Sequence, residues 1–319
     1  MRALAVDFIS LAVLSISIII DSPASLGWLF VLAFIVQTTS LIVLIFNMDI
    51  FLEHFSQNNK TGSIRGLFLT AFNSSFIIGP FIAGLLITDT FDAGKVYLFN
   101  AIILIPVAII TRKYLRKFED REYTRGEARK TISKVWKDRD LSRIFTSDLF
   151  LRIFYSWMVI YTPIHLHDIG FTLSDIALIM SFALIPFLLL QIPLGRIADK
   201  WLGEKEILTL GFMIAGLATM SMTFFDSHSF WFWAIILFVT RIGASMIEVM
   251  NETYLFKKIN DSDVGILSVF RSMRPLAYIV GPALASLLLI GMGISGLFFI
   301  LGLILLSGMV FSMGLKDTL

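Results

Sequence analysis

The stretch Gln191-Ile-Pro-Leu-Gly195-Arg-Ile-Ala-Asp199-Lys-Trp-Leu-Gly203-Glu-Lys205 decides the fold of this chain. Two long apolar runs, 176–190 and 207–225, lie on either side of it. A helix that crosses the hydrocarbon core of a bilayer needs about 20 predominantly apolar residues. We therefore expect the polar stretch to form a tight turn at a membrane face, between two membrane-spanning helices.

The composition of the whole chain is also that of a membrane protein. Of its 319 residues, 57% are hydrophobic and only 16% are charged, whereas soluble domains average about 45–50% and roughly 25%. Backbone polar groups in lipid must bond within the segment, so the apolar runs are expected to be helices; they do not alternate as barrel strands would. The absence of cysteine excludes disulfides and thiol chemistry.

We expect an all-α polytopic membrane protein with about ten transmembrane helices. The predicted spans are 3–20, 27–48, 66–88, 95–112, 144–164, 173–194, 206–225, 230–255, 265–290 and 294–314.

The distribution of Lys and Arg predicts the orientation. Basic residues are dense in 112–143 and recur in alternate loops, while the other loops contain only Lys95. Basic loops stay on the cytoplasmic side. We therefore expect a protein of the plasma or inner membrane with both termini in the cytoplasm.

The polar stretch resembles the signature loop of the major facilitator superfamily, Gly-x-x-x-Asp-(Arg/Lys) followed by Gly and basic residues. Gly203 comes one residue later than in the usual pattern. The resemblance implies two helical bundles that rock about a central cavity, and a gating role at this loop. The gating residues expected from it are Gly195, Arg196, Asp199, Lys200, Gly203 and, close by, Glu252.

The chain divides, on this reading, into an incomplete four-span bundle (1–114), a cytoplasmic linker (115–140) and a six-span bundle (141–319). Within the linker, Ile132, Val135 and Trp136 have helical spacing among basic residues. That spacing suits either a short helix on the membrane surface or a solvated linker.

A repeated motif supports the two bundles: Gly79, Pro80 and Gly84 in the first correspond to Gly281, Pro282 and Ser286 in the second. The first copy resembles the Gly-Pro signature of antiporters. Proline bends a helix and small residues allow close packing, so the motif serves either transport or packing alone.

Aligning Asp21-Ser22 with Asp226-Ser227 predicts that the first two helices of an expected twelve are absent, which gives a four-plus-six arrangement. A truncated or misplaced start and a natural ten-helix protein both explain this. On either account we expect an exposed groove in the first bundle.

Charged residues inside membrane spans are costly unless paired or hydrated, so they mark candidate functional sites. Two sets fall on single helix faces: Asp148, Arg152 and Tyr155, and Arg241, Ser245, Glu248 and Glu252. The resemblance places both in cavity-lining helices. The alternatives are a structural Asp148–Arg152 pair, and a Glu252 that holds Arg196, Lys200 or Lys205.

Other polar residues give weaker signals. Gln37 is a cavity candidate, whereas Thr38 and Thr39 are as well explained by bonds to their own backbone. Asn73 is expected either to pack against a neighbouring helix or to contact the substrate. Arg271 and Arg274 meet Glu252, lipid phosphates or an anionic substrate. His165, His167 and His228 are expected to be solvated in outer loops.

We find no zinc spacing, nucleophile elbow or phosphate-binding Gly-rich loop. The sequence therefore predicts no enzyme, cofactor, metal or nucleic-acid partner. It predicts a monomeric secondary transporter of a small molecule, coupled to a proton or another ion, with export or antiport favoured. The alternatives are a non-transporting fragment or partner subunit, and an importer of nutrients such as sugars or organic anions.

Overall fold

The structure is a computed structural model, which describes residues 2–19, 27–55, 61–86, 93–115, 128–200, 202–225, 227–259 and 263–316. Most of the predicted linker before residue 128, and the aligned residues Asp21, Ser22 and Asp226, lie outside the described residues.

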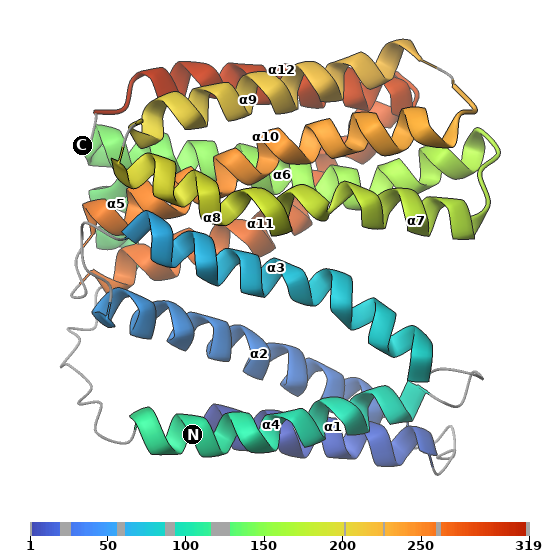
Figure 1. The fold of residues 1–319 in the computed structure, drawn as a ribbon, viewed down its shortest axis with the longest axis vertical. Helices are drawn as coiled ribbons and strands as arrows, with labels where there is room; N and C mark the ends of the chain where they lie inside the picture. The colour runs from blue at the N-terminus through green and yellow to red at the C-terminus, as the bar shows by residue number, and fades with distance from the viewer. Residues whose placement is uncertain are drawn as a thin grey trace. The chain divides into compact units, whose positions relative to one another are not determined.

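Every regular element among the described residues is a helix, as expected for apolar runs in lipid. The α-helices are α1 (Arg2–Ile19), α2 (Gly27–Phe55), α3 (Thr61–Leu86), α4 (Ala93–Leu115), α5 (Ala128–Lys137), α6 (Arg139–Asp168), α7 (Leu173–Ala183), α8 (Ile185–Lys200), α9 (Glu204–Ser221), α10 (Phe230–Lys258), α11 (Val264–Leu289) and α12 (Ile294–Met313), with a 3₁₀ turn, η4 (Met222–Phe224), after α9. Figure 1 labels them.

The predicted spans are confirmed as helices. Each corresponds to one α-helix, except that 173–194 is divided between α7 and α8 at Leu184 and that 206–225 ends in the 3₁₀ turn η4. Pro186 explains the break, because it has no N–H to donate one turn back and its ring crowds the carbonyl there. By length and composition, eight described segments are apolar enough to cross a membrane.

The predicted turn over 191–205 is wrong for most of its length. The helix α8 continues to Lys200 and α9 begins at Glu204, so Gln191, Gly195 and Asp199 are helical. The N–H of Leu202 donates to the carbonyl of Ile197 at 3.1 Å and closes the end of α8. A membrane helix can continue beyond the lipid, where water hydrates its polar side chains, so polarity alone does not mark its end.

Contacts divide the chain into two compact units. The first unit comprises 1–54 and 76–123, and in it α1 packs against α4. The buried side chains there include Leu11, Leu14 and Ala101.

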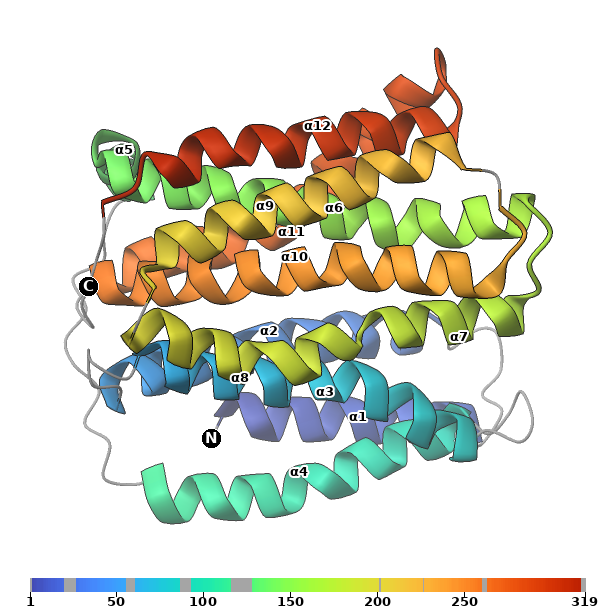
Figure 2. The ribbon, with the colours of Figure 1, turned by 45° about the horizontal axis from the view of Figure 1, so that its top comes forward.

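The second unit comprises 55–75, which includes the first part of α3, and 124–319. Within it α9 lies between α10 and α12, and α6 packs against α10, α11 and α12 (Figures 1 and 2). Its core is aromatic, with Trp233 and Phe298 fully buried. His165 stacks edge-on against both rings, at 5.1 and 5.3 Å between ring centroids. The prediction that His165 is solvated is therefore wrong, because α6 extends past it into this core.

The residues for which the sequence left open a short surface helix or a solvated linker form a helix, α5. Val135 is buried, and α5 packs on α6 and α11, while Ile132 and Trp136 are exposed. Lys134 pairs with Asp263 at 2.7 Å. Asp138 then caps α6 by accepting hydrogen bonds from the N–H groups of Asp140 and Leu141. Contact of α5 with the membrane surface remains a prediction.

Candidate functional site

The site is built around Arg152, which lies one turn after Asp148 on α6. The guanidinium Nη2 is 3.1 Å from Asp148 Oδ1, and Nε donates to Asp148 Oδ2 at 3.3 Å. Both side chains are buried. The i, i+4 spacing places the two groups on the same face of the helix, acid before base, which is the favourable order for an ion pair.

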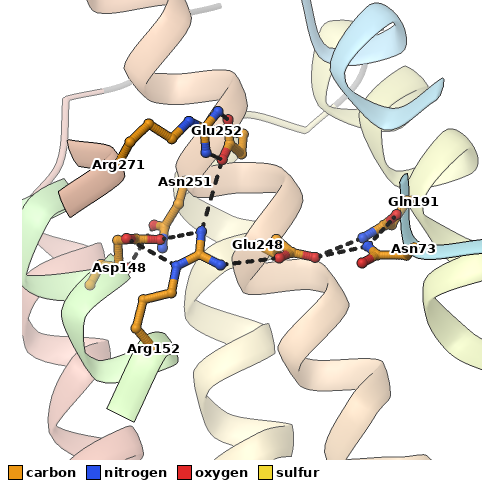
Figure 3. Close-up of polar contacts among 9 residues, drawn as sticks. Asn73, Asp148, Arg152, Gln191, Glu248, Asn251, Glu252 and Arg271 are labelled. Carbon is orange, nitrogen blue, oxygen red and sulfur yellow. Dashed lines mark hydrogen bonds and ion pairs between the residues drawn. The ribbon is translucent and has the colours of Figure 1, made fainter. Parts of the chain in front are cut away.

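Two carboxylates from α10 approach the same guanidinium. Glu248 Oε1 lies 3.4 Å from Arg152 Nη1, and Glu252 Oε1 lies 3.9 Å from Nη2. Figure 3 shows Arg152 between Asp148 and the two glutamates. One cation is thus shared among three buried carboxylates, which the i, i+4 spacing of Glu248 and Glu252 aligns on one face of α10.

Glu252 has a second cationic partner, Arg271 of α11. Arg271 Nη1 and Nη2 both donate to the Glu252 carboxylate, the latter at 2.8 Å. This bidentate pairing is the strong form of an Arg–carboxylate contact. The alternative that Glu252 holds Arg196, Lys200 or Lys205 is therefore wrong. Arg196 and Lys200 are exposed on α8. Arg152 and Arg271 therefore both pair with Glu252, while Asp148 and Glu248 share Arg152.

Two amides complete the surroundings of Glu248. Gln191 Nε2 of α8 donates to Glu248 Oε2 at 2.9 Å, and Asn73 Nδ2 of α3 donates to the same oxygen at 3.2 Å. Asn73 Nδ2 also lies 3.2 Å from Gln191 Oε1. The Glu248 carboxylate therefore links α10 with α6 on one side and with α3 and α8 on the other (Figure 3).

The remaining polar residues of the two faces have separate roles. Ser147 of α6 donates to Asn251 of α10 at 2.7 Å. Ser245 donates to its own backbone, at the carbonyl of Ile242. Tyr155 packs beside the rings of Phe154 and Phe187, and its hydroxyl has no hydrogen-bond partner in the structure.

Arg241, near the middle of α10, stands apart from this network. It is buried, and its guanidinium carbon lies 4.9 Å from the centre of the Phe154 ring. Its Nε and Nη1 atoms have no hydrogen-bond partner in the part of the chain that the structure describes. Among the described residues, no carboxylate lies within ion-pairing distance of it.

Asp199, at the end of α8, caps the start of α3. Its carboxylate accepts hydrogen bonds from the N–H groups of Gly62 and Ser63, at 3.0 and 2.8 Å, and from the Ser63 hydroxyl at 3.0 Å. These N–H groups have no partner within the helix, and a negative charge is favourable there. Lys257 of α10 is 3.7 Å from Asp199 and 2.6 Å from Glu204.

Glycines allow α3 and α8 to approach this closely. A Cβ atom added to Gly195 would lie 2.2 Å from the carbonyl oxygen of Gly62, and one added to Gly66 would lie 2.4 Å from that of Gln191. Only residues without a side chain allow such backbone contact. The same contact brings Asp199 to the start of α3.

We expect Gly66→Ala to lower the free energy of unfolding by about 1–3 kcal/mol, because the added methyl group forces α3 and α8 apart. The control is Gly27→Ala, where a Cβ meets nothing within 4 Å; there we expect a change within about 0.5 kcal/mol. Unfolding in mixed detergent micelles measures both. Equal stability of the two variants would contradict the tight contact.

The sequence profile of the Major Facilitator Superfamily matches residues 3–166 and 158–318, which together span nearly the whole chain. The chain belongs to the major facilitator superfamily. Members of this superfamily are transporters rather than enzymes. The protein is thus a multi-pass membrane transporter with a small-molecule substrate. No curated protein matches its sequence significantly.

Solved facilitator structures share the fold. A bacterial homologue of the iron transporter ferroportin, in an outward-facing state, superposes with a TM-score of 0.72 at 14% identity, over 98% of this chain and 80% of that one. The human organic anion transporter MFSD10 (TETRAN) gives a TM-score of 0.66 at 14% identity, over 98% and 75%. At this identity the likeness concerns the fold alone.

The structure describes the contacts of the second Gly-Pro motif of this facilitator protein, but only part of the first. Gly281 packs against α6, where a Cβ would lie 3.0 Å from Ser156 Oγ, and its carbonyl accepts from Trp157 at 2.8 Å. Tyr161 donates to the carbonyl of Pro282 at 3.4 Å. In the first copy, a Cβ added to Gly79 would meet no described atom within 4 Å. The side chains of Pro80 and Gly84 lie outside the described residues.

On α2 of the first unit, Gln37 is half-buried. The hydroxyls of Thr38 and Thr39 donate to backbone carbonyls one turn earlier in α2, at 2.9 and 2.8 Å. This agrees with the expectation that they bond to their own backbone.

Sequence reasoning missed the parts played by Gln191 and Lys257, and left Asn73 and Arg271 undecided. Gln191 opens the signature stretch, but as an uncharged residue it was not among the candidates. Gln191 could have been recognised as a candidate from its position one turn before Gly195, on the face of α8 that meets α3. Arg271 was one of two arginines on α11; Arg274 is exposed, whereas Arg271 pairs with Glu252.

Proposed function

We propose that this facilitator protein is a proton-coupled secondary transporter and that Glu248 is its proton-binding group, with Asp148 as the alternative. The observation that carries the proposal is the single Arg152 shared among three buried carboxylates. Three carboxylates held this close together repel one another when all are ionised, and buried charge is costly. A bound proton neutralises one of the carboxylates and relieves that repulsion.

The contacts of Glu248 suggest how a proton acts on the fold. As a carboxylate, Glu248 accepts from Arg152 through one oxygen and from Asn73 and Gln191 through the other. Protonation weakens all of these contacts, because charge-assisted hydrogen bonds are about twice as strong as neutral ones. The links from α10 to α3, α6 and α8 therefore loosen together, which favours a second arrangement of these helices.

The direction of transport that we propose is export by antiport, with the first Gly-Pro motif as support. We further propose a monomer in the cell membrane with both termini in the cytoplasm, in agreement with the basic loops. The two solved structures are named as a homologue of an iron transporter and as an organic anion transporter. Because their sequence identity to this chain is low, the substrate has to be argued from the site itself.

The test is a proteoliposome assay with an imposed pH gradient and a panel of labelled anionic, neutral and cationic small molecules. Transport of at least one compound that responds to the sign of the gradient supports the proposal. Transport at the same rate with and without the pH gradient would contradict proton coupling. A failure to transport any of the compounds would contradict the transporter function.

Asp199 offers a prediction about gating. We expect Asp199→Asn to slow the exchange between transport states, because the neutral amide caps α3 less strongly and loses its attraction to Lys257. The measurement is substrate exchange at equal protein abundance. The control is Asp175→Asn, which weakens a capping box confined to α7. An unchanged exchange rate in Asp199→Asn would refute the gating role.

A further inference from the structure

Arg241 is a buried cation without an ion pair among the described residues, and the proton-coupled mechanism gives it no role. Its side chain is 3% exposed near the middle of α10. By contrast, Arg152 contacts three carboxylates and Arg271 is held by Glu252. Arg241 faces the Phe154 ring instead, and no described residue forms a hydrogen bond with its Nε or Nη1 atom.

The aromatic contact alone does not explain why the arginine is retained there. A phenyl ring stabilises a guanidinium only modestly, while an unpaired cation inside a membrane is costly. An arginine also cannot escape this cost by losing its proton. A bound ligand of opposite charge would offset the cost.

The surroundings indicate the chemistry of that partner. Tyr155 follows Phe154 on α6, with 5.7 Å between the two ring centroids, and its hydroxyl also has no hydrogen-bond partner among the described residues. The unused groups are thus N–H and O–H donors, which match the oxygens of a carboxylate or phosphate. Phe187 packs beside Tyr155 at 6.0 Å between ring centroids and provides apolar surface.

We propose that Arg241 binds the acidic group of a small organic anion, with Tyr155 as a second donor and Phe154 and Phe187 against the organic part. The inference rests on the proposed transport function and names the class of its substrate. Anion oxygens are also found on lipid headgroups. The position of Arg241 near the middle of a membrane-spanning helix favours a soluble anion over a headgroup.

The test uses purified protein in nanodiscs of neutral lipid, with benzoate, succinate and phenyl phosphate as anionic probes. Benzamide and benzylamine are the neutral and cationic counterparts. We expect at least one anion to raise the melting temperature, and its apparent affinity to fall about tenfold to a hundredfold in Arg241→Gln. Arg241→Lys and Tyr155→Phe should give intermediate losses. Arg139→Gln, an exposed arginine at the start of α6, should bind as the parent protein does.

The inference is overturned if no anion stabilises the protein, if benzylamine stabilises it instead, or if Arg241→Gln binds the anion undiminished. It is also overturned if only phosphatidylglycerol stabilises the parent protein, since the site would then belong to a lipid. Transport of benzylamine without anion binding would refute this inference and leave the transporter function standing. Anion binding without transport of any probe would support this inference and count against the transporter function.

Discussion

Replacing Glu248 by glutamine is expected to reduce transport driven by a pH gradient to the level of protein-free liposomes, while substrate exchange without a gradient continues. Glutamine has the shape of a protonated glutamic acid but cannot take up or release a proton. It also keeps an acceptor for the amides of Asn73 and Gln191. The variant should therefore behave as a carrier held in the protonated form.

The measurement is uptake into proteoliposomes with and without a pH gradient, beside counterflow at equal pH. Glu206→Gln is the control, because Glu206 is an exposed carboxylate in the first turn of α9. If gradient-driven transport survives in Glu248→Gln and fails in Asp148→Asn, the proton site lies on α6 instead. Survival in both variants would contradict the carboxylate network as the coupling site.

Replacing Arg152 by leucine is expected to lower the free energy of unfolding by about 3–5 kcal/mol, because it leaves buried carboxylates without their shared cation. Asp148 and Glu248 lose their ion pair, whereas Glu252 keeps Arg271. Removal of one charge should therefore restore part of the stability. We expect Arg152→Leu with Asp148→Asn to be more stable than Arg152→Leu alone.

Unfolding by titration with a denaturing detergent in mixed micelles measures both effects. Arg139→Leu is the control, since this arginine is exposed, and its change should stay within about 0.5 kcal/mol. A loss in Arg152→Leu no larger than in the control would show that the three carboxylates do not depend on this cation. The double variant tests the electrostatic origin, because a loss from packing alone would not be restored by Asp148→Asn.

The sequence by itself determined the membrane class, the approximate limits of the helices and the polar faces of two of them. These properties depend on local spacing: about 20 apolar residues cross a bilayer, and residues four apart share a helix face. For this reason Asp148 and Arg152, or Glu248 and Glu252, were recognisable as neighbours. The signature residue Asp199 was also recognisable, although its helical setting was not.

Only the tertiary structure decided which cation meets which carboxylate. Asn73 and Glu248 are 175 positions apart, and Glu252 has several basic residues nearby in sequence but pairs with Arg271. Spacing along one helix does not specify the rotation of its neighbour, which depends on close backbone contacts such as Gly62 with Gly195. The same packing gives Arg152 three carboxylates, while Arg241, on the same face of α10 as Glu248, has none among the described residues.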